Sequence, residues 1–198
     1  MDEMNIWTEL LVEGFKEDPG LKAQIAQIEQ PWKYFGLQLQ AEMMAYKKCG
    51  LLHTYGLGEG LLMGYSSDDL RDKTFIKSIQ ESNQMVLNQI PEAILMQMGQ
   101  NVAPVAAITE ANWYEKYISN QAFFVIQVVV VKENLRGTGI FRKLITPIIE
   151  KCEAENKVIA LQTHNPDNLA KYQHFGFEIM EEKFSKDLNL TCYNLLRK

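Results

Sequence analysis

The chain has 198 residues, 46% of them hydrophobic, and a formal net charge of −5. A chain of this length and composition can bury a sizeable hydrophobic core without disulfides or a structural metal site. Glycine (12) and proline (6) are too few for a collagen-like or disordered protein. A mildly acidic chain binds polyanions poorly, so we do not expect nucleic acid as a partner.

The cysteines and the apolar runs indicate a cytoplasmic protein without membrane contacts. Cys49, Cys152 and Cys192 are widely spaced and form no CxxC pair, so we expect neither a disulfide framework nor a metal site. The first ten residues carry acids where a secretion signal has bases. The longest apolar run, 123–131, is interrupted by Gln127 and is less than half the length of a membrane span.

The first fifty residues are predicted to be helical. Apolar residues recur at helical spacing over 6–15, and we expect this helix to end at the Asp-Pro-Gly of 18–20. Pro31 suits the first turn of a second helix. That helix should end at the basic residues and glycine of 47–50.

A hairpin and further helices follow. The apolar runs 51–55 and 60–65 flank a glycine-rich turn and predict a β-hairpin. The polar residues 66–69 form a good helix cap, and the pattern predicts one helix over 70–90. Residues 91–122 contain two segments that the sequence leaves open between helix and loop.

The second half alternates strands and helices. Residues 123–131 are dense in β-branched and aromatic types, as in a strand buried on both faces. A glycine loop at 136–139 leads into a helix over 140–152, and 158–162 predict a second strand. A short helix over 166–174 and a hairpin of strands 177–184 and 190–196 complete the pattern. This order predicts a mixed α/β sheet.

The loop Arg136-Gly137-Thr138-Gly139 between a strand and a helix suits an anion. Glycines let the backbone present its N–H groups, and the helix N-terminus adds about half a positive charge. The spacing does not fit a Walker loop, and Arg142 stands where a dinucleotide fingerprint has its third glycine. A plain strand-to-helix turn remains the alternative for this loop alone.

A second motif lies about thirty residues further on. In the segment 165–177, Tyr172 stands four residues before Gly176-Phe177. Together with the strand end at 129–131 and the glycine loop, this segment resembles the GNAT superfamily of N-acetyltransferases. The resemblance covers residues 123–184.

The resemblance implies an α/β fold: a GNAT-like mixed, mostly antiparallel sheet with helices on both faces. The sheet should splay between the strands at 123–131 and 158–162. We expect a single domain over 1–198, in which 1–122 form the acceptor side and 123–198 bind acetyl-CoA and complete the fold.

The resemblance also implies an activity, in which a primary amine of a small molecule attacks the thioester of acetyl-CoA. The Val129 N–H is the candidate donor to the oxyanion, and Tyr172 is the candidate acid for the leaving thiolate; a packing tyrosine is its alternative role. The implied cofactor-binding residues are Val129, Val131, Arg136, Gly137, Thr138, Gly139, Ile140, Phe141, Asn165 and Asn168. Asn165 is equally suited to cap a helix before Pro166.

A general base is harder to assign. Gln127 lies near where some relatives have a carboxylate, and it cannot act as a base. Among the histidines, His164 is the best candidate for the general base. An ordered water chain that takes the proton is the alternative. The acceptor pocket is expected in the first half, where six aromatic residues are candidates and about four of them are expected to be core: Trp32, Tyr34, Phe35, Tyr55, Trp113 and Tyr114.

Two departures from the family pattern leave other functions open. Asn134 replaces a usual Gln or Arg, and Phe141 replaces a small residue and would crowd a diphosphate. A domain that binds acyl-CoA without catalysis, as a sensor or assembly part, is therefore the alternative function. A longer acyl donor and a homodimer also remain open.

Overall fold

The computed structural model describes residues 2–198, which form one sheet and a set of mostly short helices. The strands are β1 (Leu52–Tyr55), β2 (Gly60–Ser66), β3 (Phe123–Val131), β4 (Val158–Thr163), β5 (Glu178–Ser185) and β6 (Leu190–Arg197). The α-helices are α1 (Glu3–Phe15), α2 (Pro19–Gln24), α3 (Pro31–Lys48), α4 (Ser67–Arg71), α5 (Lys73–Leu87), α6 (Glu92–Ala106), α7 (Glu115–Ile118), α8 (Ile140–Ala154) and α9 (Leu169–His174). Two 3₁₀ turns are η1 (Glu133–Leu135) and η2 (Pro166–Asn168).

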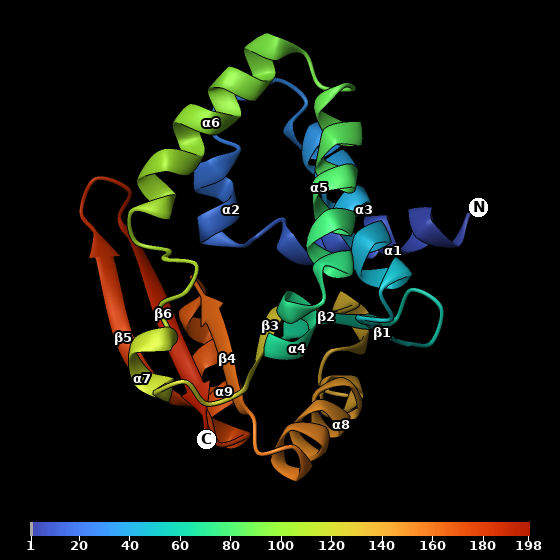
Figure 1. Ribbon diagram of the computed structural model, residues 1–198. Coiled ribbons are helices and arrows are strands. Elements are labelled where there is room, and N and C mark those ends of the chain that lie inside the picture. The colour runs from blue at the N-terminus through green and yellow to red at the C-terminus, as the bar shows by residue number, and fades with distance from the viewer. Residues whose placement is uncertain (1) are drawn as a thin grey trace.

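The six strands lie in the order β1-β2-β3-β4-β6-β5 (Figure 1). β3 and β4 run parallel, and the other neighbouring pairs are antiparallel. A parallel pair needs a crossover connection, which α8 supplies between β3 and β4. The predicted mixed, mostly antiparallel sheet is confirmed.

β3 and β4 separate partway along β3. The two strands pair from Phe123 to Ile126 only. β3 continues to Val131 and keeps its antiparallel pairing with β2 over that stretch. Beyond Ile126, no strand within residues 2–198 covers the β4-facing edge of β3. The splay predicted between 123–131 and 158–162 is therefore present.

Gln127 forms a bulge in β3. Met63 of β2 lies opposite Val128, and the next residue, Gly64, lies opposite Ile126, so Gln127 has no partner in β2. Gln127 is exposed while most of β3 is buried, which corrects the expectation of a strand buried along its whole length. A bulge of this kind bends the strand and re-aims the side chains that follow it.

Helices cover both faces of the sheet, as predicted, and the bulge changes which residues they cover. On the α8 face, α8 and α9 pack over Phe124 and Ile126. On the opposite face, called the α3 face, α1, α3 and α5 pack over Val128 and Val130. Ile126 and Val128 thus lie on opposite faces although they are two residues apart, which an unbroken strand does not allow.

The chain begins a second helix where the sequence pattern predicted only the end of the first. α1 ends at Phe15, and α2 begins at Pro19. The Oδ1 of Asp18 accepts a hydrogen bond from the N–H of Leu21 at 2.8 Å. An aspartate followed by proline is a good start for a helix, so the same residues end one helix and cap the next.

The helix expected over 70–90 is two helices, α4 and α5. Asp72 accepts a hydrogen bond from the Thr74 N–H at 3.0 Å and begins α5. The predicted cap at the start of this region is present, because Ser66 and Asp69 form a reciprocal capping box. A polar side chain that caps a new helix therefore divides the predicted helix in two.

The four helices between β2 and β3 form an arch over the α3 face (Figure 1). α5 packs along α3, and α6 returns to α2. The side-chain amide of Asn101 on α6 donates to the carbonyls of Gln24 at 3.0 Å and Ala26 at 2.7 Å. The end of α6 and the residue Ile108 after it pack on the β5–β6 hairpin through a small core: Val105, Ile108, Leu190 and Cys192.

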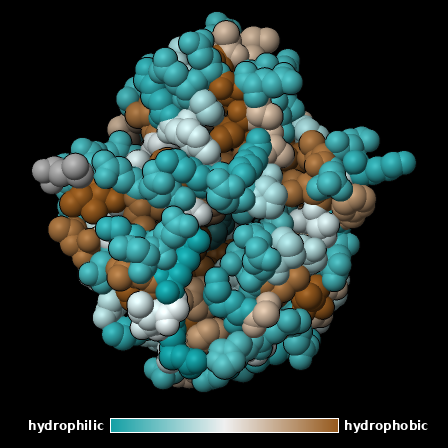
Figure 2. Space-filling model, turned by 180° about the vertical axis from the view of Figure 1, so that it is seen from behind, coloured by the Kyte–Doolittle hydropathy of each residue, from teal (hydrophilic) through white to brown (hydrophobic). Residues whose placement is uncertain are grey.

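The surface seen from behind is mainly hydrophilic, with apolar patches and a narrow hollow near the middle of that face (Figure 2). No helix in residues 2–198 is both long enough and apolar enough to cross a bilayer. The same residues contain no group of three histidine, cysteine or acidic side chains placed to hold a metal ion.

Candidate functional site

The uncovered edge of β3 presents backbone polar groups. The Lys132 N–H donates to the carbonyl of Glu59 at 2.8 Å, on the β2 side. Successive peptide groups of a strand point to opposite edges, so the N–H and C=O groups of Val129 and Val131 point to the uncovered edge. Two of the residues predicted to bind the donor therefore border the splay.

The glycine loop connects this edge to the N-terminus of α8. Gly137 and Gly139 have φ angles of 83° and 89°, in the left-handed region that favours glycine. A Cβ at either position would meet no atom within 4 Å. α8 has no side-chain cap, unlike α2, α4 and α5, so its first-turn N–H groups at Ile140, Phe141 and Arg142 are left for an anion.

Cationic side chains gather around the loop, and two of them were not predicted from the sequence. Burial lowers the pKa of Lys171, and the nearby positive charge of Arg136 lowers it further. The Lys171 ammonium lies 5.3 Å from the ring centre of Phe141. Arg142 Nη2 lies 2.9 Å from Nε2 of His174. Arg142 lies in the first turn after the loop, whereas Lys171 comes from α9, about thirty residues further on, so no local pattern pairs Lys171 with the loop.

Two side chains of the predicted loop region make contacts within the protein itself. The Thr138 hydroxyl donates to the carbonyl of Leu135 at 2.6 Å and closes the turn. The Phe141 ring packs against Tyr172 and Phe175, with ring centres 6.0 and 5.5 Å apart. The bulk of Phe141, expected to crowd a diphosphate, therefore lies against α9.

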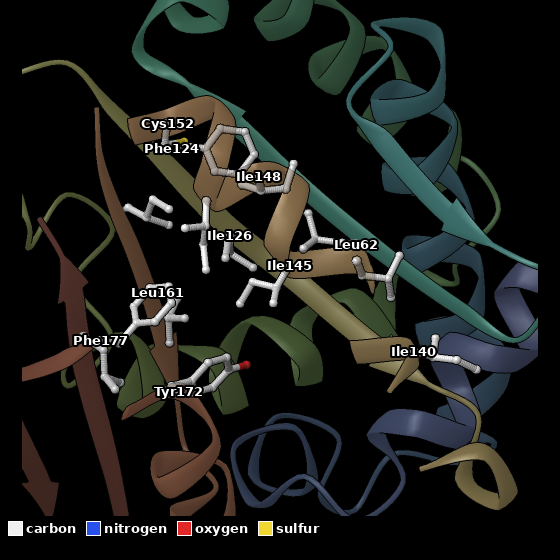
Figure 3. Close-up of a cluster of buried hydrophobic side chains, with 14 residues drawn as sticks. Leu62, Phe124, Ile126, Ile140, Ile145, Ile148, Cys152, Leu161, Tyr172 and Phe177 are labelled. Atoms are coloured by element: carbon white, nitrogen blue, oxygen red, sulfur yellow. The ribbon is translucent and has the colours of Figure 1, made fainter. Parts of the chain in front are cut away.

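Tyr172 lies on α9 with its ring in the core of the α8 face. The side chain is 7% exposed, and its ring meets Phe177 edge-on at 5.8 Å. Figure 3 shows the hydroxyl directed away from Phe177. Burial raises the pKa of Tyr172, and the negative charge of Asp18 raises it further, so the phenol is protonated at neutral pH. The ring fills the core, and the protonated hydroxyl is able to act as an acid.

Both predicted asparagines make local hydrogen bonds. The Oδ1 of Asn165 accepts from the Asp167 N–H at 3.0 Å and caps η2, as its alternative role required. The Oδ1 of Asn168 accepts from Lys171 Nζ at 3.0 Å. A role for either side chain in binding pantetheine stays a prediction.

His164 joins the end of β4 to two elements of the first half. Its Nε2 lies 3.0 Å from Oγ1 of Thr109, which follows α6. A Cβ on Gly20 of α2 would come within 2.3 Å of its Nδ1. Burial lowers the pKa of His164 more than the charge of Asp18 raises it, so the imidazole is neutral at pH 7. A neutral imidazole is able to accept a proton.

The six candidate acceptor aromatics do not gather in one pocket. Trp113 and Tyr114 are 2% and 1% exposed and belong to the core. Tyr55 lies on the α8 face, where its hydroxyl accepts from Lys143 Nζ at 2.7 Å. The other three pack around α2, α3 and α6: Trp32, Tyr34 and Phe35. The expectation that most are core is confirmed for Trp113 and Tyr114.

Several solved structures match nearly the whole chain. One, described as histone acetyltransferase HPA2 and related acetyltransferase from Corynebacterium glutamicum ATCC 13032, has 15% identity and a TM-score of 0.59, with 98% of this chain and 90% of that chain covered. The chain has the GNAT fold. PH1933 from Pyrococcus horikoshii OT3 has 14% identity and a TM-score of 0.55, over 100% of this chain and 92% of its own. No family model and no curated protein matches the sequence.

The GNAT fold brings most of the predicted site residues to one region. Val129, Val131 and the glycine loop follow one another along the uncovered edge, and Tyr172 packs against the start of α8 through Phe141. Gln127 is exposed at the bulge where that edge begins. His164 stands at the end of the neighbouring strand.

Proposed function

We propose that this protein is an acetyl-CoA-dependent N-acetyltransferase that acts on a primary amine of a small molecule. One observation carries the proposal: an uncovered strand edge leads through the short η1 turn into a glycine loop and an uncapped helix N-terminus, with open space at the two glycines. A strand edge pairs with the amides of an extended chain, and a helix N-terminus binds phosphate. The pantetheine arm and the diphosphate of CoA supply those two groups in that order.

The donor would be held mainly by backbone groups. Val129 and Val131 would pair with the pantetheine amides, and the N–H groups of residues 136–141 would receive the diphosphate. Arg136 and Lys171 would add positive charge beside it. Asn165 and Asn168 are placed after β4, on the other side of the splay, where the pantetheine would pass.

The chemistry is a direct transfer. The amine nitrogen forms a bond to the thioester carbonyl carbon, and the carbon–sulfur bond then breaks with its electron pair on sulfur. The Val129 N–H would stabilise the intermediate oxyanion, a contribution of about 3–4 kcal/mol for a well-placed donor. Tyr172 would protonate the thiolate, and the proton lost by the amine would pass to His164 or to ordered water.

Two measurements test the function. Acetyl-CoA should raise the melting temperature in a concentration-dependent way, because it binds only the folded chain. Thiol release from acetyl-CoA with a panel of small amines should then identify turnover. Stabilisation without thiol release for any amine would instead support the alternative of an acyl-CoA sensor. No stabilisation by acetyl-CoA or by longer acyl-CoAs would contradict both.

A further inference from the structure

A cavity of about 530 Å³, called the α1 cavity, lies between α1, the β1–β2 turn and the segment that leads from β3 to the glycine loop. A volume of this size suits a small molecule. A Cβ on Gly14 of α1 would come within 2.1 Å of Val130 of β3. A Cβ on Gly58 of the turn would come within 2.6 Å of Ile6 of α1. α1 therefore lies directly against the end of β3 and against the turn, and these elements form the walls of the cavity.

Part of the lining of the α1 cavity is apolar. Ile6 and Leu10 contribute to it from α1, and Leu57 contributes from the turn. Leu57 is 64% exposed, and Ile6 is half-buried. An apolar group that covered these side chains would remove their surface from water, which strengthens binding. The cavity therefore offers both the room and the surface for the apolar body of a ligand.

The charged part of the lining is divided between two walls. Glu9 and Glu13 lie one turn apart on α1 and so share one side of the helix. Lys132, Glu133 and Arg136 lie on the segment after β3. Glu9 forms no ion pair with any residue of 2–198. Three carboxylates against two cationic side chains give the lining a net negative charge, which favours a positively charged ligand.

The α1 cavity adjoins the path proposed for CoA at its phosphate end. Val131, which lines the cavity, borders the uncovered edge of β3, and Arg136 belongs to the glycine loop. Val129, where the transfer would take place, lies two residues back along β3, which corresponds to about 7 Å. The pantetheine arm would occupy the edge between these two positions. A ligand in the cavity would therefore lie beside the donor and would not be the amine that reacts.

We propose that the α1 cavity is a second ligand site, which takes a small organic cation with an apolar body and couples its binding to that of CoA. The apolar body would cover Leu57, and the ammonium would pair with Glu9. The phosphates of CoA would lie beside Arg136, so a cation in the cavity would attract them. Each ligand would then strengthen the binding of the other by the same factor. The coupling rests on the proposed acetyltransferase function, whereas the cation site does not.

Three probes test the cation site by calorimetry in the absence of CoA: hexylammonium, methylammonium and hexanoate. Hexylammonium and methylammonium carry the same charge and differ in the apolar body. Hexylammonium should bind the parent protein more tightly by about 10-fold or more, because each buried methylene group strengthens binding about 4-fold. Hexanoate has the apolar body with the opposite charge and should bind more weakly than hexylammonium.

Variants locate the bound cation. Glu9→Gln should weaken hexylammonium binding roughly 5-fold, the upper range for an exposed ion pair. Glu13 is less suitable for this test because it pairs with Lys16. Leu57→Ser, at an exposed position, should weaken binding of hexylammonium and leave that of methylammonium nearly unchanged. Glu150→Gln, exposed on α8 and outside the cavity, is the control and should bind both cations as the parent does.

The coupling is measured with CoA, which carries no acetyl group to transfer. Saturating hexylammonium should lower the Kd of CoA by about 2- to 5-fold in the parent, as expected for charges that attract across solvent. A Kd of CoA that hexylammonium raises or leaves unchanged would overturn the coupling. No binding of hexylammonium, or equal binding by the parent, Glu9→Gln and Leu57→Ser, would overturn the cation site. Hexylammonium binding to a protein that binds no CoA or acyl-CoA would instead overturn the proposed function and leave the cation site in place.

Discussion

Gly20, at the start of α2, lies against His164 at the end of β4, so closely that a Cβ would stand 2.3 Å from the imidazole Nδ1. The same imidazole contacts Thr109 at 3.0 Å. This point is where α2, the arch and the splayed sheet meet. The position of His164 is therefore set by α2 and by the segment that follows α6.

Gly20→Ala should disturb this junction and spare the donor site. The methyl group would force the imidazole or α2 to move, and overpacking of this kind costs about 1–3 kcal/mol. Denaturant unfolding should show the loss of stability, and the KM for the amine should rise. Stabilisation by CoA should be unchanged, since the glycine loop is not involved.

Gly99→Ala is the matched control for that substitution. Gly99 is exposed on α6, and a Cβ there would meet nothing within 4 Å. The variant should be more stable than the parent by up to about 1 kcal/mol, because alanine favours a helix over glycine. Equal stability of Gly20→Ala and the parent would show that the imidazole moves without cost.

The second half of the fold was predictable because its signals are local. Each of three signals can be recognised within thirteen residues or fewer: the strand at 123–131, the loop at 136–139 and the segment 165–177 around Tyr172. The break at Asp72 was not predictable from periodicity, because the apolar pattern continues across it. A single side-chain cap, Asp72, ends one helix and begins the next. Leu70 of α4 and Phe75 of α5 still pack in the same apolar cluster.

The rest of the site depends on contacts between distant segments. The bulge at Gln127 is defined by how β3 pairs with β2. The sequence of either strand alone does not contain that information. Lys171 lies near Arg136 of the loop although it comes from α9, and His164 meets Thr109 only when the segment after α6 packs against the end of β4. A sequence shows the charge of these side chains, and the fold decides what each one faces.

Gly137→Val and Gly139→Val should each remove most of the stabilisation by acetyl-CoA. Both positions have positive φ, where a side chain costs about 1–2 kcal/mol per residue. The added side chain would also occupy the open space in front of the loop. Thermal melts with and without acetyl-CoA measure the effect. A full ligand shift in both variants would contradict the assignment of the loop to the diphosphate.

Lys171→Gln should weaken CoA binding by roughly 10-fold, because one positive charge beside the phosphates is lost. The Kd should rise with the salt concentration in the parent and less steeply in the variant, since salt screens the missing charge. Lys186→Gln, exposed in the β5–β6 turn, is the control and should bind CoA as the parent does. Identical affinity of Lys171→Gln and Lys186→Gln would remove Lys171 from the donor site.

The lowered pKa of His164 predicts a loss of stability in acid. In the unfolded chain the imidazole titrates near its ordinary pKa of 6.5, and in the folded chain burial lowers that value. The unfolded chain then binds more protons, so the free energy of unfolding falls as the pH drops below about 6.5 and levels off below the folded pKa. His53 is half-buried, its pKa is also lowered by burial, and it acts in the same direction.

His164→Gln isolates that contribution. Denaturant unfolding of the parent and the variant between pH 7.5 and pH 5, roughly the range about the ordinary histidine pKa, gives the difference. The variant should lose less stability across this range, with the remaining slope due to His53 and to other groups. Parallel curves for the two proteins would show that His164 is not held neutral by the fold.

Tyr172→Phe should separate the acid role of this residue from its packing role. The phenyl ring still fills the core beside Phe141 and Phe177, so the free energy of unfolding should change by less than about 1 kcal/mol. If the hydroxyl protonates the leaving thiolate, kcat should fall about 100-fold or more, with CoA binding nearly intact. Tyr172→Ala is unsuitable, because the cavity it leaves would add a loss of stability.

The control for this substitution is Tyr193→Phe, which removes a hydroxyl from another tyrosine that packs against the same core. It should keep the kcat of the parent. The pH dependence supplies a second readout: burial keeps the Tyr172 phenol protonated well into the alkaline range, so the parent should not lose activity through this group near its ordinary pKa of 10. Normal turnover of Tyr172→Phe on a good amine would show that Tyr172 is a core residue and that water supplies the proton.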